Sequence, residues 1–533
     1  MILLRAIPIP LDGGPEALRA AAAKRLRCPP AQLRDLRLVH RAVDSRDKTR
    51  VHFVCHIALS LDSPAAEALA LRRCPAAVPL PAGAEGPSPP PVRRAGEAPP
   101  VVVGFGPAGI FAALELARAG LRPIVLERGH PVDARRAALA DFLRTRRLDP
   151  DCNMQFGEGG AGTFSDGKLG TGISDPLTRR VLAELAAHGA PEEILIDAKP
   201  HVGTDRLGPV ITALREEIGI LGGEVRFGRR MTALLTAGGV VRGVCCRQLD
   251  TEKEEEIAAG AVFLCVGHSA RETFEVLLRQ GVAMAQKPFA MGVRIEHPRE
   301  LIDRAQYGPF AGHPALGAAD YKLACHLPGG SGAYTFCMCP GGSVVCAASE
   351  PDGLAVNGMS EHARDGAASN AALLVGVDPA QEGPDALAGI RLQRRMERTA
   401  FLLGGGTFSA PAQTLGDFLS GQASRSFGTV LPSIPTGAVP CDLRAVLPPA
   451  VAETLAGALP LLNQKLRGFA LPDAVLTAPE TRSSSPVRIL RDDSRQANLR
   501  GLFPCGEGAG YAGGIVSAAV DGIRSAWAWM GGM

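Results

Sequence analysis

Three glycines and one glutamate in the first third of the chain have the spacing of a dinucleotide-binding turn. An apolar stretch, PPVVV, leads into Gly104-x-Gly106-x-x-Gly109, and Glu127 ends the next apolar stretch, PIVLE. In such a turn the first glycine permits a tight bend, the second lets the backbone approach a pyrophosphate, and the third lets the helix pack on the strand. An acidic residue at this offset binds the adenosine ribose. These residues therefore predict a site for FAD or NAD.

The elements that must position this turn are also visible in the sequence. The apolar run before Gly104 predicts a strand, a helix is expected up to Ala119, and a second strand ends at Glu127. Residues 205–229 predict a helix followed by a strand, and residues 231–270 predict short strands, a polar hairpin and an apolar strand that enters Gly267. A helix, a small β-meander and a returning strand are similar to the arrangement in flavoproteins of the glutathione reductase type.

A second glycine-rich turn lies close to the carboxyl end, in GLFPCGEGAGYAGGIVSAAVDGI, residues 501–523. It predicts a strand that places Glu507 under the cofactor, although many relatives of this fold have aspartate there. Gly513 and Gly514 permit close backbone approach, and a helix follows them. The N-terminus of that helix offers partial positive charge to the flavin edge that becomes negative on reduction. No second G-x-G-x-x-G follows a strand, so no separate NAD domain is expected, and NAD(P)H remains open as a transient electron donor.

Longer motifs carry a family resemblance that extends over nearly the whole chain. MQFGEGGAGTFSDGKLGTGISDP at 154–176, together with KPFAMGVRIEHP, FCMCPGG and ETRSSSPVRI, resembles the bacterial family of uncharacterised FAD-dependent dehydrogenases, also called NAD(P)/FAD-dependent oxidoreductases. The resemblance implies FAD as cofactor and leaves the substrate undefined. It also implies that Lys168 lies beside the cofactor, where it either stabilises reduced flavin or holds an anionic substrate; a solvated lysine is the open alternative. The predicted cofactor-binding residues are Gly104, Gly106, Pro107, Ala108, Gly109, Glu127, Arg128, Gly159, Gly160, Ser165, Asp166, Lys168, Gly267, Gly506, Glu507, Gly513, Gly514 and Ile515.

Other reactive side chains are not assigned a catalytic role. Cys337 and Cys339 would project from one face of a strand and could relay electrons, but inert buried thiols are the favoured interpretation. His268 and His362 are treated as scaffold residues rather than proton donors. The polar residues expected on a substrate-facing wall are Arg294, Glu296, Arg482 and the serines 483–485.

For Arg482 two roles remain open. It either clamps an anionic group or pairs with a carboxylate that holds two domains together.

Length and composition predict several domains. The fold class is α/β, a Rossmann-type FAD-binding domain of the glutathione reductase kind with an inserted α+β domain and a small N-terminal α+β domain. The predicted units are the N-terminal domain over 1–78, a proline-rich linker over 79–100, the first part of the FAD-binding domain over 101–285, the inserted substrate domain over 286–495 and the last part of the FAD-binding domain over 496–533.

Charge and cysteine usage set the remaining expectations. The first 80 residues contain 13 Lys and Arg against seven Asp and Glu, whereas the whole chain has a net charge of +3. The leading hypothesis is an FAD-dependent oxidoreductase that passes hydride through flavin N5 to a small molecule. The alternative is a flavoprotein that acts on RNA, or a non-redox scaffold, with the basic domain as its contact surface. The scattered cysteines lack metal-ligand spacing, so no metal site is expected. The absence of long apolar runs predicts a cytoplasmic protein without membrane contact. Nucleic acid is not the favoured partner, and no oligomeric state is assigned.

Overall fold

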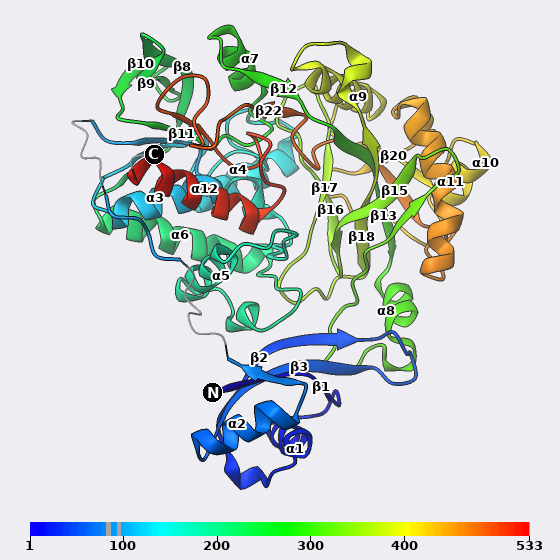
Figure 1. Ribbon diagram of the computed structural model, residues 1–533. Helices are drawn as coiled ribbons and strands as arrows, with labels where there is room; N and C mark the ends of the chain where they lie inside the picture. Colours follow the sequence, from blue (N-terminus) through cyan, green and yellow to red (C-terminus); the bar gives the residue numbers. More distant parts are fainter. Residues whose placement is uncertain (81–86, 93–97, 532–533) are drawn as a thin grey trace.

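The computed structural model describes residues 1–80, 87–92 and 98–531. Half of the proline-rich linker, residues 81–86 and 93–97, lies outside the described residues. Figure 1 shows a small N-terminal sheet at one end, and above it two larger α/β parts side by side.

The N-terminal part is an antiparallel four-stranded sheet in the order β2-β3-β1-β4, with two helices. Its elements are β1 (Ile2–Ile9), α1 (Pro15–Leu26), β2 (Leu33–Asp44), β3 (His52–Leu61), α2 (Pro64–Arg73) and β4 (Ala77–Pro79). The sequence predicted α1, β2 and β3 but missed the other three elements. The short strand β4 ends at Pro79, one residue past the predicted domain boundary.

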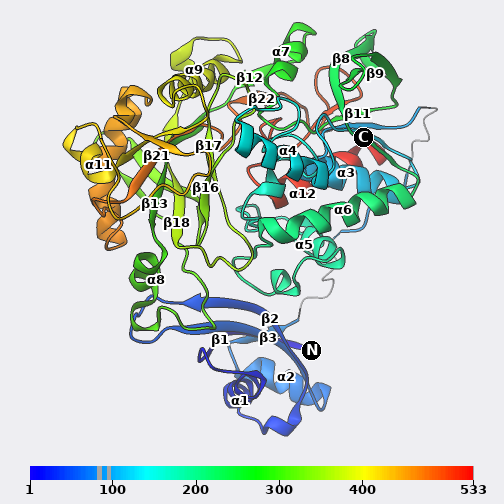
Figure 2. The ribbon, with the colours of Figure 1, turned by 180° about the vertical axis from the view of Figure 1, so that it is seen from behind.

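The long β2–β3 ribbon lies against the rest of the molecule (Figure 1 and Figure 2). Arg41 Nε donates to Asp197 Oδ1 at 2.9 Å, and the backbone of Arg41 exchanges hydrogen bonds with the segment 196–198. At the far end of the ribbon, Lys48 donates to the backbone oxygen of Gln306. The ribbon thus contacts both larger parts, at residues outside the cavity described below.

A parallel five-stranded sheet in the order β23-β11-β5-β6-β7 forms the centre of the second part. Helices cover one face through Val102, Phe263 and Phe503, and the three-stranded meander β8–β9–β10 packs on the other face through Val101 and Val103. The strands are β5 (Val101–Val103), β6 (Ile124–Leu126), β7 (Glu224–Arg226), β8 (Arg229–Ala237), β9 (Val240–Gln248), β10 (Glu254–Ala258), β11 (Val262–Leu264) and β23 (Leu502–Pro504). The helices are α3 (Pro107–Arg118), α4 (Val132–Thr145), α5 (Leu177–Ala187), α6 (Thr204–Ile220), α7 (Arg271–Arg279) and α12 (Ile515–Met530). This arrangement agrees with the helix, meander and returning strand predicted from the sequence.

The third part is a seven-stranded sheet in the order β14-β15-β18-β13-β21-β19-β20, antiparallel except for the pair β19–β20. Its strands are β13 (Phe289–Pro298), β14 (Ala324–His326), β15 (Gly332–Cys339), β18 (Ala368–Val377), β19 (Ala410–Thr414), β20 (Ala438–Pro440) and β21 (Val475–Glu480). Around it lie α8 (Arg299–Tyr307), the pair β16 (Ser343–Cys346) and β17 (Val356–Met359), α9 (Ala388–Leu403), α10 (Leu415–Ser420) and α11 (Pro449–Lys465). The antiparallel pair β12 (Met284–Gln286) and β22 (Val487–Ile489) lies where the chain enters and leaves this part.

Among the residues that the structure describes, no helix is both long enough and apolar enough to span a membrane.

Candidate functional site

One cavity of about 330 Å³ brings together residues from both larger parts. Its walls come from the turn after β5, the loop after β11, the turn before α12, and the ends of β15 and β21. The predicted residues that line it are Gly104, Gly106, Pro107, Ala108, Glu127, Arg128, Gly160, Ser165, Asp166, Lys168, Gly267, Glu507, Gly513, Gly514 and Ile515. Segments as far apart in the sequence as Gly104 and Ile515 therefore share one site.

Three predicted residues, Gly109, Gly159 and Gly506, lie behind the walls instead of lining them. A Cβ on Gly109 would overlap the carbonyl oxygen of Gly104, so this glycine permits the close packing of α3. Gly159 and Gly506 adopt φ of +80° and +76°, the left-handed region that favours glycine. The Gly506 amide donates to Asp521 Oδ2 at 2.8 Å, so this acidic residue of α12, which the sequence analysis did not single out, fixes the turn.

Two helix N-termini point at the cavity without a side-chain cap. Gly106 is the N-cap of α3 and Gly514 is the N-cap of α12, and neither helix has an acidic residue in its first turn. Free amide groups and the helix dipole together make such ends favourable for anions. A Cβ on Gly106 would have only Gly160 Cα, 3.9 Å away, within contact distance, so the backbone here is open to a ligand. These features fit the pyrophosphate of a dinucleotide.

Glu127 is buried at the end of β6 and fixes the glycine turn from behind. Its carboxylate accepts hydrogen bonds from the amides of Phe105, Gly129 and Gly157, each at 2.9 Å. The same residue lines the cavity. Its proposed contact with a ribose remains a prediction, and holding the loop is a second role that the spacing alone did not indicate.

Lys168 is part of an ion-pair cluster at the cavity wall, with 32% of its side chain exposed. Its Nζ lies 2.6 Å from Asp166 Oδ2, and Arg364 Nη2 lies 2.6 Å from the same oxygen. Burial favours the protonated form of Asp166, but the two cations outweigh it and lower the pKa of this carboxyl. The cluster keeps a fixed positive charge at the cavity wall.

His268 and Glu507 face each other in the cavity, with Nε2 and Oε1 3.7 Å apart. Burial, Arg482 and Arg271 lower the pKa of His268 to about 3, so the imidazole stays neutral. Burial raises the pKa of Glu507 to about 7. His362 lies away from the cavity and stacks on His201, with ring centroids 5.2 Å apart, as expected for a scaffold residue.

The raised pKa of Glu507 predicts a pH-dependent stability. Between the ordinary pKa, near 4.5, and about 7 the folded state binds more protons than the unfolded state, so stability falls as pH rises through this window. Glu507→Gln removes this titration. In melting curves recorded from pH 4.5 to 8, the melting temperature of the wild type should fall relative to that of Glu507→Gln across the window. Parallel curves for the two proteins would contradict the assignment.

Arg294 and Glu296 were expected on a substrate-facing wall, and this expectation was wrong. Both are fully buried on β13 and neither lines the cavity. Arg294 Nε donates to Glu480 Oε2 at 2.7 Å, and it is Glu480 that reaches the cavity. Glu296 instead accepts a hydrogen bond from Ser433. The pattern of residues along this apolar strand did not reveal that neighbouring segments bury its two charged side chains.

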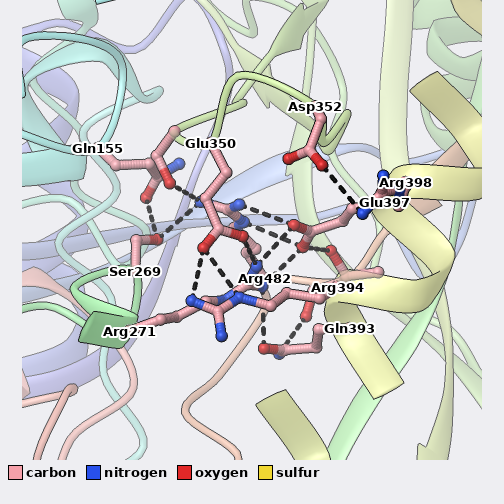
Figure 3. A network of polar contacts seen from close by, with 12 residues as sticks. Gln155, Ser269, Arg271, Glu350, Asp352, Gln393, Arg394, Glu397, Arg398 and Arg482 are labelled. Atoms are coloured by element: carbon pink, nitrogen blue, oxygen red, sulfur yellow. Dashed lines mark hydrogen bonds and ion pairs between the residues drawn. The ribbon is translucent and has the colours of Figure 1, made fainter. Parts of the chain in front are cut away.

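Arg482 belongs to a buried network that joins the two larger parts (Figure 3). Glu397 on α9 binds Arg482 at 2.8 Å and Arg271 at 2.8 Å, and Arg271 also contacts Glu350 at 2.6 Å. Arg482 Nη1 further donates to Ser269 Oγ at 3.2 Å. Of the two roles left open for Arg482, the structure therefore shows pairing with a carboxylate, Glu397 of the same part, while Ser269 is its contact with the other part; the side chain also lines the cavity.

The strand β15 does not run regularly through Cys337 and Cys339, contrary to the expectation of two thiols on one strand face. Its register with β18 shifts between Phe336 and Cys339, and Cys337 has φ of +41°. Cys337 lines the cavity, whereas Cys339 is fully buried. The sequence offered no signal for this bulge.

Comparisons with known proteins identify related sequences. A family model described as FAD-dependent protein, C-terminal domain-like, matches residues 288–483, and a domain of unknown function matches residues 1–60. A protein of Clostridium beijerinckii, described as an uncharacterized protein, is 49% identical over 430 residues, which is 80% of each chain. The chain belongs to this family of FAD-dependent proteins. The resemblance found in the sequence is thereby confirmed, and the parallel five-stranded sheet with its glycine turn confirms the predicted Rossmann-type α/β fold.

Solved structures with some similarity to the chain were also found. The E. coli quinol fumarate reductase subunit FrdA is 13% identical, with a TM-score of 0.37, over 81% of this chain and 70% of that one. A geranylgeranyl bacteriochlorophyll reductase-like protein from Thermoplasma acidophilum is 13% identical, with a TM-score of 0.36, over 80% and 76% of the two chains.

Proposed function

We propose that the protein is an FAD-dependent oxidoreductase that passes hydride through flavin N5 between a small molecule and the cofactor. One observation carries the proposal. A single cavity joins an anion-binding glycine turn, a second helix N-terminus and a set of titratable side chains. FAD, when bound, supplies the hydride chemistry, and the chain supplies binding, orientation and charge.

The lining residues divide into two groups by their chemistry. The α3 N-terminus with Gly106 and Gly160 would hold the pyrophosphate. Lys168 and the α12 N-terminus would hold the flavin edge that gains negative charge on reduction. This end of the cavity also contains Glu507, which can hold or release a proton near neutral pH.

The seven-stranded sheet and its connections supply the wall on which a substrate would rest. The residues that line it from this side are Phe336, Cys337, Asn357, Glu480, Arg482 and Ser483. Arg482 is paired with Glu397 and the carboxylate of Glu480 is paired with Arg294, so neither presents an isolated charge. This wall suits a substrate that has both apolar and polar groups.

An anaerobic titration tests the proposal. The purified protein should contain one FAD per chain, and NADH or NADPH should bleach the flavin absorbance without any RNA present. Because no second dinucleotide-binding turn is found in the sequence, we propose that the nicotinamide docks transiently over the flavin. FAD that no nicotinamide or small-molecule donor can reduce, combined with RNA binding that weakens with salt, would instead favour the scaffold alternative.

A further inference from the structure

The end of β15 holds two cysteines in an unusual backbone conformation. Cys337 adopts the left-handed region, with φ of +41°, at the point where one extra residue enters the pairing with β18. Such strain in a residue other than glycine costs free energy and clusters at functional sites. The bulge bends the chain back on itself, and Cys339 Sγ lies 3.4 Å from the carbonyl oxygen of Cys337. The two cysteines therefore share one bulge, with the Cys339 thiol folded back on the backbone of Cys337.

Two fixed cations lie beside this pair. Lys168 Nζ is 3.6 Å from Cys339 Sγ, and Arg294 Nη1 is 2.8 Å from the Cys337 carbonyl oxygen and 4.0 Å from Cys339 Sγ. The neighbouring Cys339 thiol, together with Lys168 and Arg294, lowers the pKa of Cys337 well below its usual range against the opposing effect of burial. Cys337 lines the cavity and Cys339 lies behind it. The Cys337 thiolate therefore faces the cavity, and the Cys339 thiol lies behind it.

We propose that Cys337 and Cys339 are a dithiol–disulfide pair that reduces a small disulfide entering the cavity. The Cys337 thiolate attacks one sulfur of R–S–S–R; the substrate S–S bond breaks, a Cys337–S–R mixed disulfide forms, and one thiolate leaves and takes up a proton. Cys339 then gives up its proton and attacks the Cys337 sulfur. The mixed disulfide breaks, the Cys337–Cys339 bond forms, and the second thiol leaves. The pair is oxidised by two electrons and the substrate is reduced to two R–SH.

This activity goes beyond the proposed hydride transfer and does not require it for a single turnover. Return of the pair to the dithiol needs two electrons, the number that one hydride carries, and only that step depends on the proposed function. The oxidation of the pair can therefore be tested by itself.

Glutathione disulfide serves as the probe on the FAD-bound, full-length protein. After an acid quench, alkylation and trypsin digestion, the peptide that follows Lys322 and ends at Arg364 is analysed by mass spectrometry. The wild type should contain an internal Cys337–Cys339 disulfide. Cys339→Ser should accumulate a glutathione mixed disulfide on Cys337, and Cys337→Ser should show neither product. Cys245→Ser, a change at a partly exposed thiol on β9 that does not line the cavity, should behave as the wild type.

A stable mixed disulfide on Cys337 in the wild type, or oxidation of Cys245 while Cys337 stays reduced, would overturn the proposal.

Lys168→Met provides a second readout that does not use the substrate. At a working pH below the pKa of Cys337, its alkylation by iodoacetamide should slow by about tenfold for each unit by which that pKa rises, because the thiolate is the reactive form. Lys168→Arg should retain most of the rate. Equal rates in Lys168→Met and the wild type would remove the electrostatic basis of the inference.

Discussion

Gly106→Val is expected to abolish FAD retention while leaving the chain folded. The backbone at Gly106 is already in the extended region that valine favours, with φ of −82° and ψ of −175°, so the substitution is not strained. The new side chain would instead extend into the cavity between Gly106 and Gly160, where the pyrophosphate is expected. Purification of the variant should give a colourless protein with the wild-type circular dichroism spectrum. Added FAD should not restore flavin absorbance after desalting.

Gly14 offers a closely matched control. It is the N-cap of α1, with φ of −77° and ψ of −166°, and a proline follows it as Pro107 follows Gly106. A Cβ on Gly14 would meet nothing within 4 Å. Gly14→Val therefore makes the same chemical change at the same kind of helix start, away from the cavity, and should retain FAD. Retention of FAD by Gly106→Val, or its loss in both variants, would contradict the assignment of the α3 turn.

The parts of the site that the sequence predicted are those whose geometry is encoded locally. A strand, a glycine turn and a helix occupy consecutive residues, so Gly104, Gly106 and Glu127 were found from spacing alone. The glycines before α12 were found for the same reason. In each case the backbone conformation follows from residues within one turn, and the packing of distant segments does not alter it.

The parts that the sequence missed depend on contacts between distant segments. Asp521 supports the Gly506 turn from a helix in which it is an ordinary polar residue. Arg294 was expected on the cavity wall because it is polar. Its guanidinium instead donates hydrogen bonds to Asn357 and Asn370, which lie 63 and 76 residues further along the chain. The bulge at Cys337 depends on the register between β15 and β18, which no local motif specifies. Polar residues in apolar strands need the tertiary structure before a role can be assigned.

The largest effect on stability is expected from Glu397→Gln. Glu397 is fully buried and its two carboxylate oxygens bind both Arg271 and Arg482, with distances from 2.8 to 3.1 Å. Glutamine has the same shape but no charge, so two buried guanidinium groups would lose their shared counterion. Breaking a buried ion pair in this way costs about 3–5 kcal/mol, because the remaining charge stays desolvated. Urea denaturation, followed by circular dichroism, should show the unfolding midpoint of the variant well below that of the wild type.

Glu382→Gln is the control for this change. Glu382 pairs with Arg395, another residue of α9, at 2.7 Å, but that arginine side chain is 58% exposed, and such surface pairs contribute only about 0.2–1 kcal/mol.

The acid dependence of stability provides an independent check. Arg271 and Arg482 overcome the opposing effect of burial and lower the pKa of Glu397, so this carboxylate adds stability above its unfolded pKa, near 4.5, and the stability is lost as pH falls toward the folded value. Glu397→Gln should lack this part of the acid dependence. Equal midpoints for Glu397→Gln and Glu382→Gln would show that the network in Figure 3 does not hold the two larger parts together.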